Sequence, residues 1–158
     1  SHQDIGPWPF VNHPWPFALP FTADQTGFTK DFIGRAALEK QTDVFFTHAF
    51  AGKDLRKISA GEGSRVIDAD GQAIGTVLTC ATDMGIGRHD GDIFSVASPN
   101  KPEGFKAKGL CCGFVKVNRK LSVGQHVDIA DNRRKITVTI VDDVRPHRTA
   151  RKPMADMI

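Results

Sequence analysis

The sequence predicts a mainly β protein, a small antiparallel β-barrel that follows an extended arm and one short helix. Two observations carry this prediction. From residue 43 onward, short runs of β-branched and aromatic residues alternate with turn residues, a pattern typical of small barrels and sandwiches. Before that, five of the nine prolines fall within residues 1–30, where they disfavour helices and central strands.

Composition narrows the class of protein. Of the 158 residues, 40% are hydrophobic and 25% are charged, which is ordinary for a globular domain. No stretch approaches the roughly 20 consecutive apolar residues of a membrane span, and the first residues lack the basic and then apolar pattern of a secretory signal. The net charge of +3 is small, so we expect a protein that binds neither membranes nor nucleic acid. The odd number of cysteines, without disulfide or zinc-ligand spacing, favours a reduced, cytoplasmic protein.

The arm of residues 1–30 carries the tetrapeptide Pro-Trp-Pro-Phe twice, at residues 7–10 and 14–17. Proline fixes its own φ and pushes the preceding residue into an extended conformation. The arm also contains both tryptophans and four phenylalanines. Because a free arm rarely exposes so much aromatic surface, we expect it to pack against the barrel or against another domain.

Residues 31–42 are expected to form a linker helix. The run Ala-Ala-Leu-Glu-Lys at residues 36–40 consists of good helix formers, and Asp31 or Gly34 can cap its start. Residues 43–158 would then make up the barrel domain.

Several segments of that domain have strand patterns. Residues 44–50 are aromatic and apolar. Residues 65–79 contain Asp70-Gly71 between two β-rich runs, which predicts a hairpin with a type I′ turn. Residues 84–108 are rich in glycine, proline and charge, and are interpreted as a long loop or an irregular hairpin. The remaining predicted strands are residues 110–117 and a hairpin of residues 126–130 and 135–141 around Asp131-Asn132.

The three cysteines, Cys80, Cys111 and Cys112, are odd in number and lack the spacing of zinc ligands. We interpret them as small core residues of a reduced protein, with a vicinal redox pair as the alternative. The six histidines are scattered, and no metal site is expected.

Three segments, in chain order, resemble the C-terminal end of the glycine cleavage system T-protein (aminomethyltransferase) family. The first is Asp-Phe-Ile-Gly-Arg-Ala-Ala-Leu at residues 31–38. The second is Gly-Ser-Arg at residues 63–65, followed by the Asp-Gly turn and Ile-Gly-Thr-Val at residues 74–77. The third is Gly-Phe-Val-Lys-Val at residues 113–117, followed by Gly124 and a valine-rich hairpin. After Thr79 this chain departs from the family pattern, which makes it a divergent member.

The resemblance implies the C-terminal barrel of a tetrahydrofolate-dependent aminomethyl or methyl transferase, lining one side of the folate site. In the family the essential acidic residue lies in the N-terminal folate-binding domains, so no catalytic residue is assigned here and this chain alone is expected to be inactive. Those domains are the implied partner, together with a lipoyl carrier of the H-protein kind or a corrinoid protein, depending on the relative.

Two residues are carried over as cofactor-binding. Phe21 stands where a family tryptophan borders the folate site, and its ring is suited to stack on a pteridine. Arg65 matches a family arginine, whose guanidinium would bind a carboxylate of the ligand or form a salt bridge at the domain interface. Two other functions remain as alternatives: the folate-dependent demethylase branch of the same family, and a non-catalytic interaction module that uses the basic residues 145–152.

Overall fold

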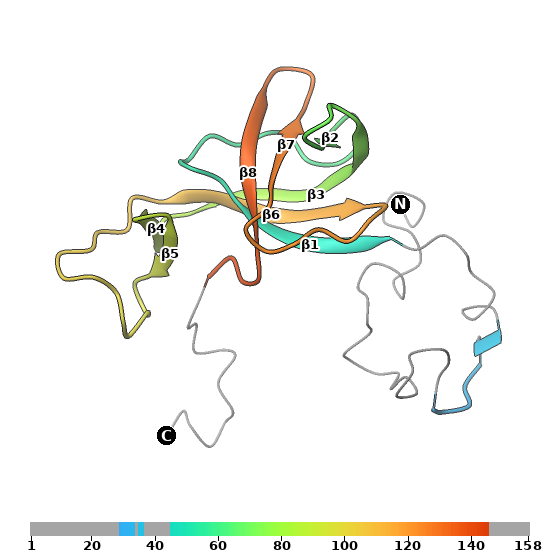
Figure 1. Ribbon diagram of the computed structural model, residues 1–158, viewed down its shortest axis with the longest axis horizontal. Helices are drawn as coiled ribbons and strands as arrows, with labels where there is room; N and C mark the ends of the chain where they lie inside the picture. The colour runs from blue at the N-terminus through green and yellow to red at the C-terminus, as the bar shows by residue number, and fades with distance from the viewer. Residues whose placement is uncertain (1–28, 34, 37–44, 146–158) are drawn as a thin grey trace.

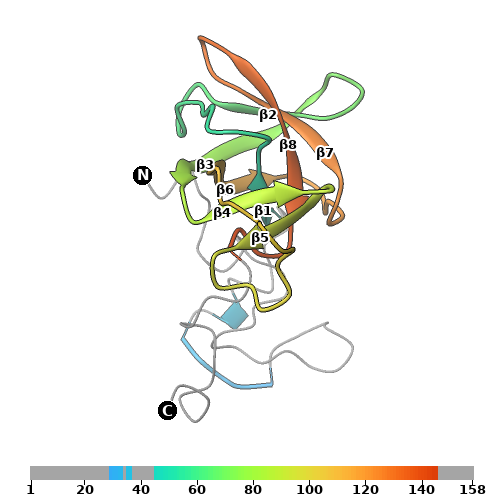
Figure 2. The same cartoon turned by 90° about the vertical axis from the view of Figure 1, so that its left-hand side faces the viewer.

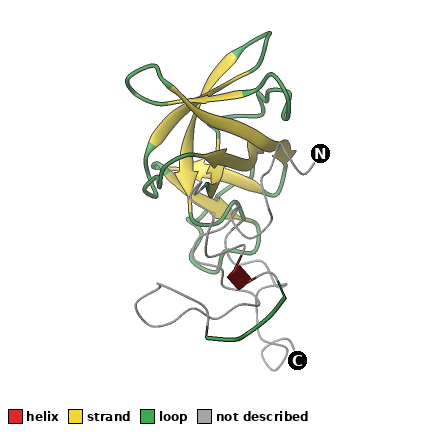
Figure 3. Cartoon of the chain, turned by 90° about the vertical axis from the view of Figure 1, so that its right-hand side faces the viewer, coloured by secondary structure: helices red, strands yellow, loops and turns green. Residues whose placement is uncertain are grey.

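The computed structural model describes residues 29–33, 35–36 and 45–145, and the regular secondary structure of this part of the chain consists almost entirely of β-strands (Figures 1 and 3). The strands are β1 (Phe46–Ala51), β2 (Arg65–Ile67), β3 (Ala73–Asp83), β4 (Ile86–His89), β5 (Asp92–Ser95), β6 (Leu110–Val117), β7 (His126–Ala130) and β8 (Lys135–Val141).

Six of these strands close into a barrel in the order β1-β6-β3-β2-β7-β8, and β8 pairs with β1 to complete it. Every neighbouring pair is antiparallel. The predicted antiparallel β-barrel is therefore confirmed, and β6, β7 and β8 have the predicted bounds. Most of the predicted arm and linker helix lies outside the described residues; Arg35 and Ala36 alone are described there as helical.

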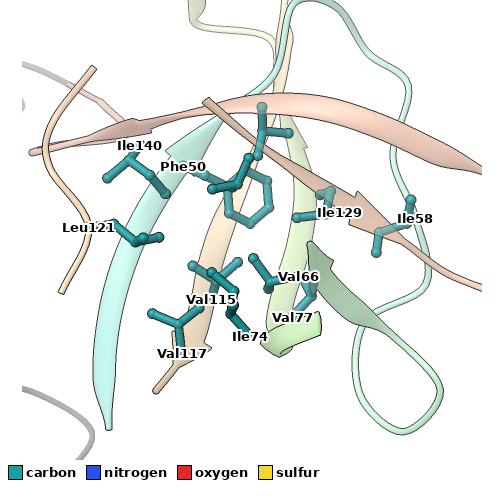
Figure 4. Close-up of a cluster of buried hydrophobic side chains, with 12 residues drawn as sticks. Phe50, Ile58, Val66, Ile74, Val77, Val115, Val117, Leu121, Ile129 and Ile140 are labelled. Carbon is teal, nitrogen blue, oxygen red and sulfur yellow. The ribbon is translucent and has the colours of Figure 1, made fainter. Parts of the chain in front are cut away.

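The barrel interior is filled by the inward-facing residues of its strands (Figure 4). Successive side chains of a strand point to opposite faces, so a half-buried strand supplies every second residue to the core. Most of the fully buried side chains are apolar, and Phe50, the largest of them, lies within the group drawn in Figure 4. The core cluster consists of Phe50, Ile58, Val66, Ile74, Val77, Val115, Val117, Leu121, Val127, Ile129, Val138 and Ile140.

The hairpin of β2 and β3 has a different turn from the predicted one. A type I′ turn needs positive φ at both central residues, but of the two residues Asp70 and Gly71 only Gly71 has it, with a φ of 81°. Instead, the Gly71 N–H donates to the Asp68 carbonyl at 3.1 Å, and the Asp68 carboxylate accepts the N–H groups of Asp70 and Gln72. The Asp68 side chain therefore organises a longer connection.

Residues 84–108 contain a second hairpin, β4–β5, which stands at the side of the barrel (Figures 1 and 2). Its turn residues, Asp90 and Gly91, both have positive φ, as a type I′ turn requires. The irregular-hairpin interpretation of this segment therefore holds for residues 86–95. A small apolar cluster of Ile86, Leu110 and Cys112 packs the hairpin onto β6.

The register of β3 against β6 shifts within the ladder. Val77 pairs with Val115, but Thr79, two residues later, pairs with Phe114, only one residue earlier on β6. One extra residue on β3 is the signature of a β-bulge. Beyond the bulge, Cys80 pairs with Gly113 and faces the barrel interior.

Candidate functional site

A loop of residues 52–64, here called the capping loop, covers one end of the barrel, here called the barrel mouth. The Gly52 N–H donates to the Cys111 carbonyl at 2.8 Å, and the Gly61 N–H donates to the Val77 carbonyl at 2.9 Å. Ile58, only 4% exposed, inserts its side chain into the core from this loop. The loop is thus tied to β6 on one side and to β3 on the other.

The turn between β7 and β8 is also hydrogen-bonded to the capping loop. The Asp131 carboxylate accepts the N–H of Ser59 at 2.7 Å, together with the N–H groups of Arg133 and Arg134. These backbone donors lower the pKa of Asp131 to about 2, so the carboxylate is ionised at neutral pH.

Arg65 follows the capping loop and begins β2, where it pairs with Ala130. Its neighbour Val66 is fully buried, so the alternation of the strand turns Arg65 outward, and its side chain is exposed. The guanidinium makes no hydrogen bond or ion pair with any other described residue. A carboxylate partner for Arg65 would therefore come from outside the described barrel.

Phe21, the other predicted cofactor-binding residue, lies outside the described residues, and its place beside a pteridine stays a prediction. The basic segment 145–152 is described only at its first residue. There the Arg145 guanidinium lies 3.6 Å from the Asp83 carboxylate, at the end of β3.

The barrel mouth also brings together two cysteines. Cys111 pairs with Thr82 and Cys80 pairs with Gly113, so the two cysteines occupy diagonal positions on one face of the β3–β6 ladder. Gly113 has no side chain, and the Thr79 carbonyl and the Phe50 ring occupy the space where its Cβ would lie. Cys111 is 1% exposed, whereas Cys80 is partly exposed.

The surroundings of the pair favour ionisation of Cys80 over that of Cys111. The neighbouring Cys111 side chain, the Ile58 backbone and the charge of Lys57 lower the pKa of Cys80, against the opposing effect of burial. The proximity of Cys80, together with burial, raises the pKa of Cys111.

A pocket of about 230 Å³ opens beside Cys111. Three cationic side chains line it, and two of them are paired: Arg56 with Asp54 at 2.7 Å and Lys135 with Asp128 at 3.0 Å. The complete lining is Gly52, Lys53, Asp54, Arg56, Cys111, Lys135, Ile136 and Thr137. The pocket therefore adjoins Cys111, and its lining does not include Cys80.

Cys112 takes no part in this arrangement. It follows Cys111 on β6, so its side chain points to the other face of the strand, into the small cluster with Ile86 and Leu110. The interpretation of the cysteines as core residues fits the buried Cys111 and Cys112, and Cys80 packs against the core cluster from a partly buried position. The alternative of a vicinal redox pair at Cys111 and Cys112 does not fit, because the two side chains diverge. Nothing in the sequence indicated that Cys80 and Cys111 are neighbours in the ladder, because residues 31 positions apart show no local pattern.

Within residues 29–33, 35–36 and 45–145, no three His, Cys, Asp or Glu side chains are placed to hold a metal ion. In the same part of the chain, no helix has the length and apolar character needed to cross a bilayer. Comparison with known proteins leaves the family unassigned. No protein-family model matches this chain, and no curated protein sequence matches it.

Proposed function

We propose that this chain is the C-terminal barrel domain of a tetrahydrofolate-dependent aminomethyl or methyl transferase resembling the glycine cleavage T-protein. The observation that carries the proposal is Arg65, whose exposed guanidinium has no partner among the described residues. A guanidinium without a partner in its own domain is suited to bind a carboxylate supplied by another domain or by the folate itself.

The arrangement of the motif segments supports the same proposal. The second and third of the segments that resemble the family fall on β2, β3 and β6, and β3 lies between β2 and β6 in the closed barrel. Segments that lie side by side in space can form one wall of a shared site, although they are separated in sequence.

In this proposal the chain binds and orients and does not itself transfer a proton. Arg65 holds a carboxylate, of the folate tail or of the adjoining domain, and Phe21 stacks on the pteridine. Tetrahydrofolate supplies the nitrogen that accepts the one-carbon unit. The acidic residue that orients the reacting groups belongs to the N-terminal folate-binding domains. The one-carbon unit arrives on a lipoyl carrier protein or a corrinoid protein, and the reaction is cytoplasmic.

Isothermal titration calorimetry tests the proposal. Tetrahydrofolate is titrated into the complete product of the parent gene and, separately, into the 158-residue chain. We expect saturable binding to the complete product and weak or no binding to the chain alone. Absence of heat from the complete product at saturating folate would end the proposal.

Arg65→Ala in the complete product tests the assigned contact. Arg133→Ala is the matched control, because Arg133 is an exposed arginine in the turn after β7 and contacts Asp131 through its backbone N–H. Loss of one charge-assisted hydrogen bond costs about 1.5–3 kcal/mol, so folate affinity should fall by roughly 10- to 150-fold for Arg65→Ala at an unchanged melting temperature. A matched fall in melting temperature would indicate an interface salt bridge, and equal effects of both variants would contradict a specific contact.

A further inference from the structure

A hollow of about 390 Å³, here called the cationic groove, lies where the capping loop, the β4–β5 hairpin and the segment leading into β6 meet. Its volume falls within the range of small-molecule sites, roughly 300–1,000 Å³. Each of the three segments contributes at least one cationic side chain. The complete lining is Lys53, Asp54, Leu55, Arg56, Arg88, Lys108, Gly109 and Leu110. The proposed transferase function uses none of these residues.

The positive charges of the cationic groove are only partly compensated. Asp54 is the single carboxylate in its lining, and it is engaged by Arg56, whose Nε–H donates to it at 2.9 Å and whose Nη2 lies 2.7 Å from it. Lys53, Arg88 and Lys108 form no ion pair with any other described residue. Three cations therefore share one hollow without a paired carboxylate from the described part of the chain.

Arg88 holds its charge in a fixed position within this groove. Its half-buried guanidinium donates to four neutral acceptors, which are the carbonyls of Gly52, Gly91 and Ala51 and the hydroxyl of Thr139. A guanidinium has five N–H donors, so one N–H on Nη1 has no acceptor among these contacts. The four bonds order the side chain before any ligand arrives, and the fifth donor is left for an anion.

Charge and apolar surface together indicate the class of ligand. A hollow lined by cations attracts anions, and three unpaired cations match a phosphate dianion better than a single carboxylate. The terminal oxygens of a phosphate also accept hydrogen bonds from several donors at once. Beside these charges, the Leu55 side chain is 42% exposed and offers apolar contact to an organic group.

We propose that the cationic groove binds a soluble phosphate monoester with a small apolar body. Arg88, Lys53 and Lys108 hold the phosphate, and the body lies against Leu55. Arg65, the residue assigned to the folate contact, does not line this groove. The phosphate site is therefore independent of the proposed transferase function, and either can fail without the other.

Calorimetric titration of the full chain with phenyl phosphate, a monoester with a compact ring, tests the ligand class. We expect saturable binding that weakens with salt, and weaker binding of both inorganic phosphate and benzoate, because each lacks one half of the recognised chemistry. Benzoate that binds as tightly as phenyl phosphate would overturn the phosphate class. Inorganic phosphate that binds as tightly would overturn the apolar contact. Binding to vesicles that contain phosphatidate, without binding to phenyl phosphate, would replace the soluble ester with a lipid headgroup.

Lysine variants test the location of the site. Lys53→Gln and Lys108→Gln should each weaken phenyl phosphate binding by roughly two- to fivefold, with the unliganded melting temperature unchanged, because both side chains are exposed. Lys57→Gln is the matched control, since Lys57 is an exposed lysine of the same loop but does not line the groove. Equal weakening by all three variants would indicate attraction by net charge alone and would overturn the site.

Glu103 provides a variant with the opposite sign. It lines an adjoining hollow that shares Arg88 and Lys108 with the groove, and it forms no ion pair with either of them. Glu103→Gln removes a negative charge near the bound phosphate and should therefore tighten binding. Weaker binding by Glu103→Gln would contradict the placement of the phosphate at Arg88 and Lys108. Arg88 itself is left in place, because it also joins the hairpin to the barrel.

Discussion

The carboxylate of Asp131 accepts the N–H of Ser59 at 2.7 Å, and this bond joins two segments separated by 72 residues of sequence. One segment is the capping loop, and the other is the turn between β7 and β8. The same carboxylate organises its own turn through the N–H groups of Arg133 and Arg134. The Asp131 side chain therefore stabilises both the β7–β8 turn and the capping loop.

Asp131→Ala should lower the melting temperature by several degrees, because three backbone donors lose their acceptor at once. The pKa of Asp131 is lowered to about 2, so its contribution is complete above its ordinary pKa of 3.8 and is lost as the pH falls toward 2. Thermal unfolding of the wild type should therefore become easier below pH 4, with a smaller dependence in the variant. Asp70→Ala is the control, because Asp70 is exposed on the β2–β3 turn and uses only its backbone N–H. Equal losses in both variants would contradict the role of Asp131.

His48 should give the protein a second, separate pH dependence. Its Nε2 accepts the N–H of Leu121 at 3.0 Å, and burial, with Lys120 as a second cause, lowers the pKa of His48 below its ordinary value of 6.5. The folded state favours the neutral ring, so this contribution is complete above about pH 6.5 and is lost as the pH falls. We expect the melting temperature to decline as the pH falls below about 6.5, and His48→Gln, which keeps an acceptor, to reduce the slope. His126→Gln, on exposed His126, should leave the slope as it is; a slope that survives His48→Gln would point to another group.

Gly113 should tolerate no side chain. A Cβ at this position would overlap the Thr79 carbonyl oxygen across the ladder and would also press on the Phe50 ring in the core. Gly113→Ala should therefore destabilise the barrel by about 1–3 kcal/mol, measured by urea unfolding. Gly71→Asn is the comparison. Gly71 has a φ of 81° but open space around it, and asparagine tolerates that conformation, so the change should have little effect. A neutral Gly113→Ala would mean that β3 and β6 can separate at low cost.

Arg88 should decide whether the β4–β5 hairpin stays against the barrel. Its guanidinium donates to the carbonyls of Ala51 and Gly52 and to the Thr139 hydroxyl, and it also donates within the hairpin to the Gly91 carbonyl. Arg88→Met should remove the three links to the barrel at a cost of roughly 2 kcal/mol.

Hydrogen exchange provides the measurement for Arg88. We expect faster exchange across residues 86–95 in Arg88→Met, with the barrel strands unaffected. Arg88→Lys should give a similar result, since a single ammonium cannot reproduce the planar fork. His89→Ala, on the exposed neighbour, is the control. Protection of β4 and β5 that is unchanged in Arg88→Met would show that the apolar cluster alone holds the hairpin.

The barrel could be predicted from the sequence because its signals are local. The alternation of Ile136, Val138 and Ile140 and the turn at Asp131 define β7 and β8 within a few residues of chain. Local signals also explain the one wrong turn. The sequence contains two Asp-Gly dipeptides, at residues 70–71 and 90–91, and the type I′ turn predicted for the first occurs at the second. At Gly71 the backbone conformation is set by the Asp68 carboxylate, which accepts the N–H groups on either side of it. At Gly91 it is set by the two-residue connection between β4 and β5.

The candidate site could be predicted only in part, because its chemistry depends on long-range pairing. Arg65 was identified from a motif, and the structure places it on the outer face of β2. The cysteine pair needs β3 and β6 to align, and it needs the capping loop to bring the Ile58 backbone close to Cys80. None of these relationships leaves a periodic trace in the sequence.

The bulge in β3 determines which way Cys80 faces. Counted in strict alternation from buried Val77, Cys80 would point away from the core, and only the extra residue at Leu78 returns it to the interior. Deleting Leu78 would keep every cysteine in the chain and would turn the Cys80 side chain from the core to the outer face of β3. The length of this strand segment, and not the identity of its residues alone, therefore sets which side chains of β3 reach the core, and an aligned cysteine in another sequence has the same surroundings only if that length is kept.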